Sequence, residues 1–397
     1  MNNQVFEKLM TLTGRWHELD GQVKVTGNDP VLPTRFPIGE AVAGVHAAIG
    51  LAVSDLWELQ TGRKQEVRVD VRAAAATLQS YVYLRVKGSR DRTIPPNVTR
   101  FYPAKDGRWV LIHAGFPHLR QGMFNLLECE DTPESVAEAV LKWEAEALEE
   151  AIAEAGLCGA MARSAPEWAE HPQGQVLSKM PVLEIIKIAD SPPEPCPAGE
   201  QPLSGLRVLD LTRVLAGPTC ARTLAEHGAD VLKIGAEHLP SAEFFVQDTG
   251  HGKRSAFLDL SEESGSKKLN ELIRGADVFS QSYRLGALNN RGYSPEKVAA
   301  MRPGIVYVSM NCYGHEGPWK NRKGWEQLAQ TVTGLAVEQG SLTAADKGGD
   351  DDEGNKNGSL LSHLRFMGAG TACPPRLLPA AVTDYTTGYL AAFGALT

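Results

Sequence analysis

The sequence predicts an α/β protein built on a doubly wound, mostly parallel sheet, with a smaller α+β domain beside it. Three observations lead to this class. Beyond residue 205, apolar runs of strand length alternate with helix-length segments, which is typical of successive βαβ units. A proline-rich segment divides the chain into near halves. The 397 residues, 43% hydrophobic and 22% charged, are enough to fill two cores.

The second half carries the regular alternation. Gly217-Pro218 begins a helix with proline in its favoured first position, and Gly228 ends that helix. The strands on either side complete one βαβ unit, whose crossover should be right-handed. Ser261 is predicted to cap a helix that runs to Gly275, and Ser294 to begin the next one. The predicted strands are residues 206–211, 229–234, 255–260, 277–280 and 305–309.

The first half mixes helices and strands in a less regular order. Helices are predicted over residues 39–60, ending at Gly62, then after residue 71, from Thr132-Pro133, and over residues 143–154. The Glu-rich face of the last helix is most simply a solvated surface. The predicted strands are residues 66–71, 108–113, 157–162 and 181–188.

These elements divide the chain at its prolines. Residues 191–204 form an extended linker, because prolines stiffen it and prevent both a helix and a central strand. Residues 1–190 are predicted to form the smaller α+β domain with an additional helix. Residues 205–397 form the Rossmann-like domain, with a mobile loop over about 341–379 where Gly, Asp, Lys and Asn accumulate.

Charge and cysteine usage exclude several classes of protein. A net charge of −8 argues against a nucleic-acid partner, and we expect any anionic ligand to be small. The six cysteines show no metal-ligand spacing, so we expect no metal and a reduced compartment. No signal peptide and no apolar run of about 20 residues is apparent. We therefore expect a soluble, cytoplasmic protein with no membrane partner.

Asp384 is the candidate nucleophile. It lies where an apolar helix of small residues begins, and the free N–H groups and positive dipole end of a helix start favour an anion. Carboxylates are established covalent catalysts. The alternative is that Asp384 simply caps the helix, with Thr386 and Thr387 as further cap candidates.

The loop over residues 212–218 joins the first strand of the second half to its first helix. In a doubly wound fold this loop presents backbone N–H groups to phosphate. It contains one glycine where a dinucleotide fingerprint has three, and the chain has no P-loop motif. The sequence therefore gives little support for NAD or nucleoside triphosphate chemistry.

The order of several motifs resembles the class III CoA-transferases, the CaiB/BaiF family, which includes formyl-CoA and carnitine CoA-transferases and α-methylacyl-CoA racemases. The motifs are residues 202–218, 224–234, 252–260, 281–286, 302–309, 313–318, 324–330 and 383–388. The first half resembles the part of the family that normally follows its catalytic aspartate, notably at residues 57–71, 106–110 and 154–164. The chain is thus either a circularly permuted member or part of a fused two-copy protein.

The resemblance implies a CoA-transferase that moves coenzyme A between an acyl-CoA and a carboxylic acid. Asp384 would form a mixed anhydride and then an aspartyl-CoA thioester, with Glu326 as the second catalytic residue. An interlocked homodimer is also implied, with no metal and no NAD. Tyr283 would pack on the adenine or fill the core. The residues matched to CoA-binding positions are Arg213, Val214, Ala216, Lys253, Arg254, Tyr283, Arg284 and Arg291.

Two other functions remain open on the sequence. An acyl-CoA racemase or epimerase needs an acid/base group on each face of the α-carbon, and Trp325 stands where the racemases have histidine. A non-catalytic CoA-binding module is the second alternative. Residues 40–50 also repeat the spacing of residues 384–394 with Glu40 in the register of Asp384, which indicates related segments.

Overall fold

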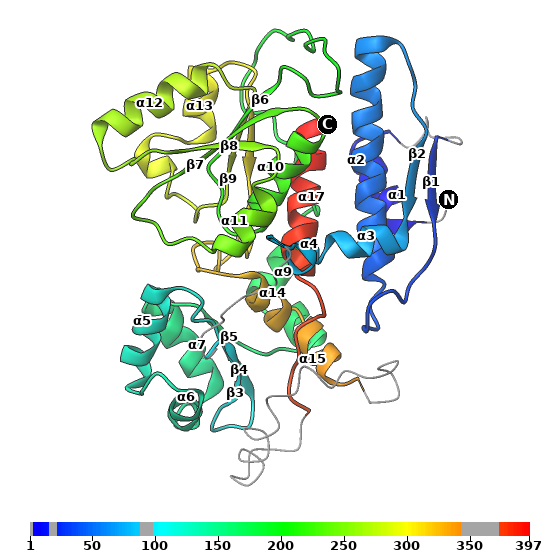
Figure 1. Cartoon of the computed structure of the whole chain (residues 1–397). Coiled ribbons are helices and arrows are strands. Elements are labelled where there is room, and N and C mark those ends of the chain that lie inside the picture. Colours follow the sequence, from blue (N-terminus) through cyan, green and yellow to red (C-terminus); the bar gives the residue numbers. More distant parts are fainter. Residues whose placement is uncertain (1–2, 16–21, 88–97, 343–372) are drawn as a thin grey trace.

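The computed structural model describes residues 3–15, 22–87, 98–342 and 373–397. Five parallel strands form its central sheet, in the order β10-β9-β6-β7-β8 (Figure 1). All five strands predicted for the second half are present. Because β6 pairs with both β7 and β9, the winding reverses between β6 and β9, which opens a crevice at their carboxyl ends. The strands are β6 (Arg207–Asp210), β7 (Asp230–Gly235), β8 (Lys253–Phe257), β9 (Val278–Gln281) and β10 (Val306–Ser309).

Helices cover both faces of this sheet. On one face, α12 and α13 bury apolar side chains such as Leu269 and Val298 against Phe279. Ser261 does not cap α12 as predicted. Glu262 is the N-cap, and Ser261 bonds to the Asp259 carboxylate instead. The helical segments between the strands are α10 (Ala216–Glu226), α11 (Glu243–Thr249), α12 (Glu263–Arg274), the 3-10 helix η2 (Asn289–Arg291) and α13 (Pro295–Met301).

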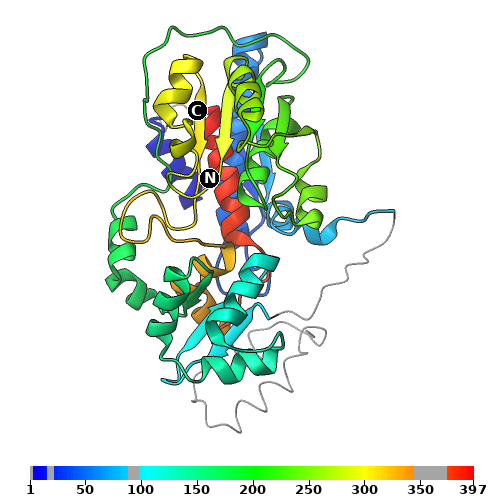
Figure 2. The same ribbon diagram turned by 90° about the vertical axis from the view of Figure 1, so that its left-hand side faces the viewer.

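The last helix, α17 (Val382–Leu396), lies between α10 on the sheet and α2 from the start of the chain (Figures 1 and 2). Tyr385, Tyr389 and Phe393 are almost completely buried in a core shared with the N-terminal helices. The N-terminal elements are α1 (Gln4–Leu12), β1 (Val23–Thr26), α2 (Ile38–Thr61), β2 (Val67–Asp70), α3 (Val71–Thr77) and α4 (Ser80–Tyr83), with β1 and β2 paired in parallel.

Helix α2 is long and apolar enough to cross a membrane by length and composition alone. However, 61% of its most apolar window is buried inside the protein, mainly against α1, α3 and α17. Gly62 ends α2 in the left-handed conformation, with φ 70°, as the sequence predicts. The apolar character of α2 is therefore explained by its place in the core.

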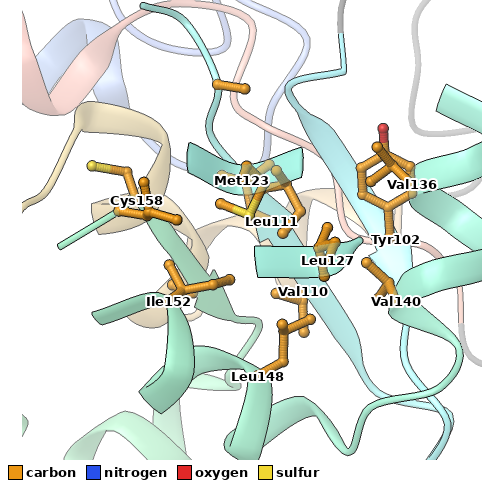
Figure 3. Packing of buried hydrophobic residues seen from close by; sticks show 14 of the residues in the cluster. Tyr102, Val110, Leu111, Met123, Leu127, Val136, Val140, Leu148, Ile152 and Cys158 are labelled. Atoms are coloured by element: carbon orange, nitrogen blue, oxygen red, sulfur yellow. The ribbon is translucent and has the colours of Figure 1, made fainter. Parts of the chain in front are cut away.

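A smaller unit lies below the central sheet in Figure 1. Its three antiparallel strands, in the order β3-β4-β5, pack against helices. Figure 3 shows the core of this unit, in which Val110 lies between Met123 and Leu148. Its elements are β3 (Arg100–Pro103), β4 (Trp109–Ile112), α5 (Pro117–Leu127), α6 (Pro133–Val140), α7 (Ala145–Glu154), β5 (Gly159–Met161), α8 (Ala165–Glu170) and α9 (Pro172–Leu177).

The face of α7 that was predicted to be solvated is partly buried. Glu149 is 0% exposed, and its carboxylate accepts two hydrogen bonds from Arg163, at 2.6 and 2.8 Å. The Met161 N–H donates a third bond to it. A buried carboxylate needs such partners, and they come from β5 and the residues that follow it.

The first half of the chain does not pack as the single unit predicted for residues 1–190. The N-terminal elements α1 to α4 share a core with α17. The core of the smaller unit contains residues of the second half: Tyr313, and Leu328 and Val332 from α14 (Glu326–Val332). Helix α15 (Leu335–Gly340) follows α14. Residues 178–206 contain no helix or strand, so the predicted strand over 181–188 is wrong. The segment predicted as a linker over 191–204 has no helix or strand either, but it is not extended throughout, because residues 202–205 form a turn in which the Ser204 N–H donates to the Gln201 carbonyl. Most of the predicted mobile loop lies outside the described residues.

Candidate active site

A cavity of about 390 Å³ lies at the crevice between β6 and β9. This volume is typical of a small-molecule site. Loops that follow β6, β9 and β10 line it, together with residues 323–326 and the start of α17. The smaller unit closes it with Phe116, His118, Leu119 and Cys158. Both halves of the chain therefore contribute to one site.

Asp384 lies in this cavity, in the first turn of α17. The helix begins at Val382, and its N-cap is Ala381, which has no side-chain cap bond. The alternative in which Asp384, Thr386 or Thr387 caps the helix is therefore wrong. Within the described part of the chain, no side chain donates a hydrogen bond to the Asp384 carboxylate. That carboxylate remains available to a ligand.

Glu326 is the second carboxyl group in the cavity, at the start of α14. It is only 8% exposed. The Gln330 side-chain amide and the Thr383 hydroxyl, the latter at 3.3 Å, both donate to its Oε1 atom. These bonds connect α14 to the residue directly before Asp384. The sequence located both carboxyl groups, but only the fold places them together.

Burial raises the pKa of both carboxyl groups, and the charge of Asp384 adds to the effect on Glu326. Burial raises the pKa of Asp384 to about 7. Burial first, and then the charge of Asp384, raise the pKa of Glu326 to about 8. Two nearby carboxyl groups titrate as a pair, and a raised pKa in a cleft is typical of a functional site. The two carboxyl groups therefore titrate near neutral pH instead of near pH 4.

The raised values predict a pH-dependent stability. Both folded pKa values lie above the ordinary values of 3.8 and 4.5, so folding is favoured while the carboxyl groups are protonated. This contribution is fully present below the unfolded pKa values and is lost as pH rises through the folded ones. We expect the free energy of unfolding, measured in urea from pH 4 to 8, to fall less steeply with pH in the double variant Asp384→Asn, Glu326→Gln. A constant difference from wild type would contradict this.

A buried polar cluster fixes α17 behind the nucleophile. The Tyr385 hydroxyl lies 2.8 Å from the Ser80 hydroxyl and 3.3 Å from the Asp248 carboxylate. Arg222 donates to the same carboxylate at 3.0 Å. On the next turn, a Cβ on Gly388 would lie 2.4 Å from the Ala216 carbonyl oxygen. Glycine is therefore required for the close approach of α17 to α10, which places the start of α17 beside the β6 loop.

The β6 loop is itself strained. Val214 has φ 70°, a conformation that is rare for a β-branched residue and costs about 1–3 kcal/mol. Its side chain packs against two of the hydrophobic cores, which hold it in place. Strain of this kind is concentrated at functional sites. Arg213 beside it donates to the Pro240 carbonyl and lies 5.8 Å from the centre of the Phe116 ring.

The structure brings seven of the ten sequence-predicted site residues to the cavity. They are Asp384, Glu326, Arg213, Val214, Ala216, Tyr283 and Arg284. Tyr283 also packs against one core of the sheet, as one of its two expected roles requires, whereas its packing on adenine stays a prediction. The exposed Arg284 has no ion-pair partner among the described residues, as expected of a cation that binds a ligand.

Three predicted CoA ligands lie elsewhere. The Lys253 side chain is 2% exposed and forms an ion pair with Asp210 at 2.8 Å, while it also donates to the Pro218 carbonyl. It therefore has a structural role. Arg254 pairs with Asp230 on the surface, and Arg291 donates to the Leu260 carbonyl. Neither lines the cavity.

Sequence reasoning missed several lining residues. Lys323 directly precedes the motif that contains Trp325 and Glu326, so its position was a usable signal. The Trp325 ring stacks on His113 at 4.9 Å and contacts Phe116. Nothing in the order of the sequence indicated that Phe116 or His118 would reach this site, because the fold brings them there from the smaller unit.

The internal repeat is visible in the structure. Glu40 and Asp384 occupy the same position in the first turn, and the N-cap residues Pro37 and Ala381 have nearly equal dihedral angles, φ −77°, ψ 59° and φ −78°, ψ 62°. The Glu40 carboxylate, however, accepts a bond from the Asp29 N–H and does not line the cavity. Glu40 therefore holds the loop residue Asp29 against the start of α2, where the Asp29 carboxylate in turn accepts a bond from the Glu40 N–H.

Among the described residues, no cluster of three or more His, Cys, Asp or Glu is arranged to hold a metal ion.

A family model described as CoA-transferase family III matches residues 15–192 and 203–397. The match falls on either side of the linker.

Curated relatives are similar to only part of the chain. The acetyl-coenzyme A transferase nodX of Hypoxylon pulicicidum is 33% identical over 265 residues, 61% of this chain and 45% of that protein. The succinyl-CoA–L-malate CoA-transferase beta subunit of Chloroflexus aurantiacus is 33% identical over 169 residues, 36% of this chain and 41% of that protein. The matched region thus spans less than half the length of each relative. A solved CaiB/BaiF family protein from Brucella suis is 28% identical, with a TM-score of 0.37, over 50% of this chain and 48% of that one.

Proposed function

The chain belongs to CoA-transferase family III, and from this premise we propose that it moves coenzyme A between an acyl-CoA and a carboxylic acid through Asp384. The observation that carries the proposal is the position of Asp384. It starts α17 in a cavity at the crevice of the sheet, beside a buried second carboxyl group. A carboxylate held in this way is suited to covalent catalysis.

The proposed reaction begins when an Asp384 oxygen attacks the thioester carbonyl carbon. The C–S bond breaks, which releases CoA thiolate and leaves the acyl group on Asp384 as a mixed anhydride. The thiolate then attacks the Asp384 carbonyl carbon, which releases the donor acid and forms an aspartyl-CoA thioester. The acceptor carboxylate attacks the thioester carbonyl carbon, the C–S bond breaks, and CoA thiolate leaves a second mixed anhydride between the acceptor and Asp384. The thiolate then attacks the acceptor's acyl carbon in this anhydride, which forms the new acyl-CoA and releases the Asp384 carboxylate.

The cavity supplies conditions for these steps. A carboxylate is a weak nucleophile, so catalysis depends on close positioning and on exclusion of water from the anhydride. Asp384 has the lower pKa of the two carboxyl groups, so it is the first to lose its proton and become the nucleophilic anion as pH rises. Free N–H groups at the start of α17 favour the developing oxyanion.

Cations at the cavity suit the phosphates of CoA. Arg213, Arg284 and Lys323 all line it, and guanidinium and ammonium groups bind phosphate oxygens by charge-assisted hydrogen bonds. We extend the proposal to CoA as the bound thiol, with neither metal nor NAD in the chemistry. The interlocked homodimer and the cytoplasmic location remain predictions from the sequence.

The test is chemical trapping of the covalent intermediates. We expect the protein, incubated with acetyl-CoA or succinyl-CoA and quenched with hydroxylamine, to carry a hydroxamate on Asp384 in peptide mass spectrometry. Glu40 provides an internal control, because it occupies the same helix position outside the cavity. A hydroxamate at another residue would overturn the role of Asp384. Tight CoA binding without turnover over a broad panel of acids would instead favour a non-catalytic CoA-binding module.

A further inference from the structure

Gln330 links the two sides of the active site from behind its wall. It lies on α14 one turn after Glu326, where residues four apart share one face of the helix, and it is only 1% exposed. Its amide nitrogen donates to Glu326 Oε1, and its amide oxygen accepts the Leu378 N–H at 2.7 Å. Leu378 belongs to the segment that leads into α17 and Asp384. One buried side chain therefore holds both arms of the site, although it does not itself line the cavity.

The Leu378 N–H fixes the orientation of the Gln330 amide. A backbone N–H can only donate, so the side-chain atom that faces it must be the amide oxygen. The amide nitrogen must then face Glu326, and this nitrogen can only donate. Glu326 Oε1 also accepts the Thr383 hydroxyl at 3.3 Å. This one oxygen thus receives two hydrogen bonds, one from α14 and one from the first turn of α17.

These two bonds decide which oxygen of Glu326 carries its proton. A protonated carboxyl group has one O–H donor, and its other oxygen remains an acceptor. Within the described ranges, both side-chain hydrogen bonds to the carboxyl group of Glu326 end at Oε1. When Glu326 is protonated, its proton therefore lies on Oε2. Because Glu326 lines the cavity, the Oε2 hydroxyl is available to a ligand.

The acidity of the two carboxyl groups is consistent with this arrangement. Asp384 has the lower pKa, so loss of one proton from the pair leaves the other proton on Glu326. Burial and the charge of Asp384 raise the pKa of Glu326, whereas the hydrogen bonds from Gln330 and Thr383 lower it. The Cys312 thiol also lines the cavity. Burial raises the pKa of this thiol, so it stays neutral.

We propose that Gln330 is a positioning residue that turns the Glu326 hydroxyl into the cavity, where Oε2 donates a hydrogen bond to the carbonyl oxygen of the bound thioester. Negative charge develops on that oxygen as Asp384 attacks the carbonyl carbon, and a donor already in place stabilises the charge. The proton stays on Oε2, so the step needs no net proton transfer. The inference rests on the proposed function, because it requires the thioester carbon to lie at Asp384.

The experiment measures the pH profile of kcat, from pH 5 to 10, for CoA transfer from succinyl-CoA to labelled acetate. The basic limb of this profile should report loss of the Glu326 proton, so Glu326→Gln should lack it. Gln330→Met removes a bond that favours the Glu326 anion, so we expect the limb to move to higher pH. At the plateau, kcat should fall about tenfold, the effect of one lost hydrogen bond, with KM for succinyl-CoA unchanged.

Gln79→Met is the matched control for Gln330→Met. Gln79 donates to the Pro379 carbonyl at 2.6 Å, so it holds the residue next to Leu378, but it forms no bond with Glu326. We expect this variant to leave the basic limb in place. A limb that stays in place or moves to lower pH in Gln330→Met, one that moves equally in Gln79→Met, or one that survives in Glu326→Gln would overturn the inference.

A second pair of variants decides the matter if Gln330→Met does not fold. Thr383→Val removes the other donor to Oε1 with little change of shape, so the basic limb should again move to higher pH. Thr383→Ser keeps the hydroxyl and should leave the limb in place. Identical limbs in this pair would overturn the inference. Hydroxamate trapping on Asp384 in the wild type would then leave the CoA-transferase proposal intact, whereas failure of that trapping would remove both.

Discussion

We expect Asp384→Asn to lower the rate of CoA transfer by at least about 10⁴-fold, in the range seen when a covalent nucleophile is removed, while CoA binding remains. The amide has nearly the shape of the carboxylate but cannot form the anhydride. Asp384 forms no side-chain hydrogen bond with the described residues, so its replacement breaks no structural contact. Transfer is measured with a labelled acid, and CoA affinity by calorimetry.

Glu40→Gln is the matched control for this variant. It removes a carboxylate from the equivalent first-turn position of α2, where Glu40 accepts a bond from the Asp29 N–H instead of facing the cavity. We expect it to leave turnover unchanged. If Asp384→Asn kept a rate within tenfold of wild type, the covalent mechanism would be excluded, whatever the affinity for CoA.

We expect Lys253→Met to lower the free energy of unfolding by about 3–5 kcal/mol, the usual cost of removing one partner of a buried ion pair. Asp210 is 0% exposed and would retain a charge in the interior. Its remaining side-chain donor is the Thr212 hydroxyl, which cannot neutralise it. Urea denaturation measures the loss, and the folded variant should bind CoA with the wild-type affinity.

Arg254→Met is the control for Lys253→Met. Arg254 is the next residue on β8 and pairs with Asp230, but its side chain is 77% exposed, so its removal should cost at most about 1 kcal/mol. The contrary result would be a Lys253→Met protein of normal stability and weakened CoA binding. That outcome would restore Lys253 as a phosphate ligand, as the sequence predicted.

Most of the sheet could be predicted from the sequence because its signals are local. Each strand is an apolar run, and breaks such as Gly217-Pro218 and Gly228 mark the ends of the intervening helix. The order of motifs gave the family, and hence Asp384 and Glu326. The prediction of a strand over residues 181–188 was wrong. The apolar residues of this segment line a cavity from an irregular stretch of chain, and composition alone does not distinguish such a stretch from a buried strand.

Charged residues show where local reasoning ends. Lys253 was predicted to bind phosphate, but its buried ammonium group pairs with Asp210, 43 residues away. Glu149 was predicted to face water, but it is buried and pairs with Arg163, 14 residues away. A side chain within a short motif does not reveal which distant group it will meet. The same holds for Phe116 and Cys158, which close the active-site cavity from the smaller unit.

The sequence by itself determined the doubly wound sheet, the linker and the identity of the two carboxyl groups, since periodicity, breakers and motif order are properties of neighbouring residues. Only the tertiary structure decided that Asp384 lines a cavity without a side-chain partner among the described residues, that Glu326 lines the same cavity, and that Lys253 is paired in the interior. The physical reason is that burial and charge pairing depend on distances through space, which are set when α17 packs between α10 and α2 and the smaller unit closes the crevice.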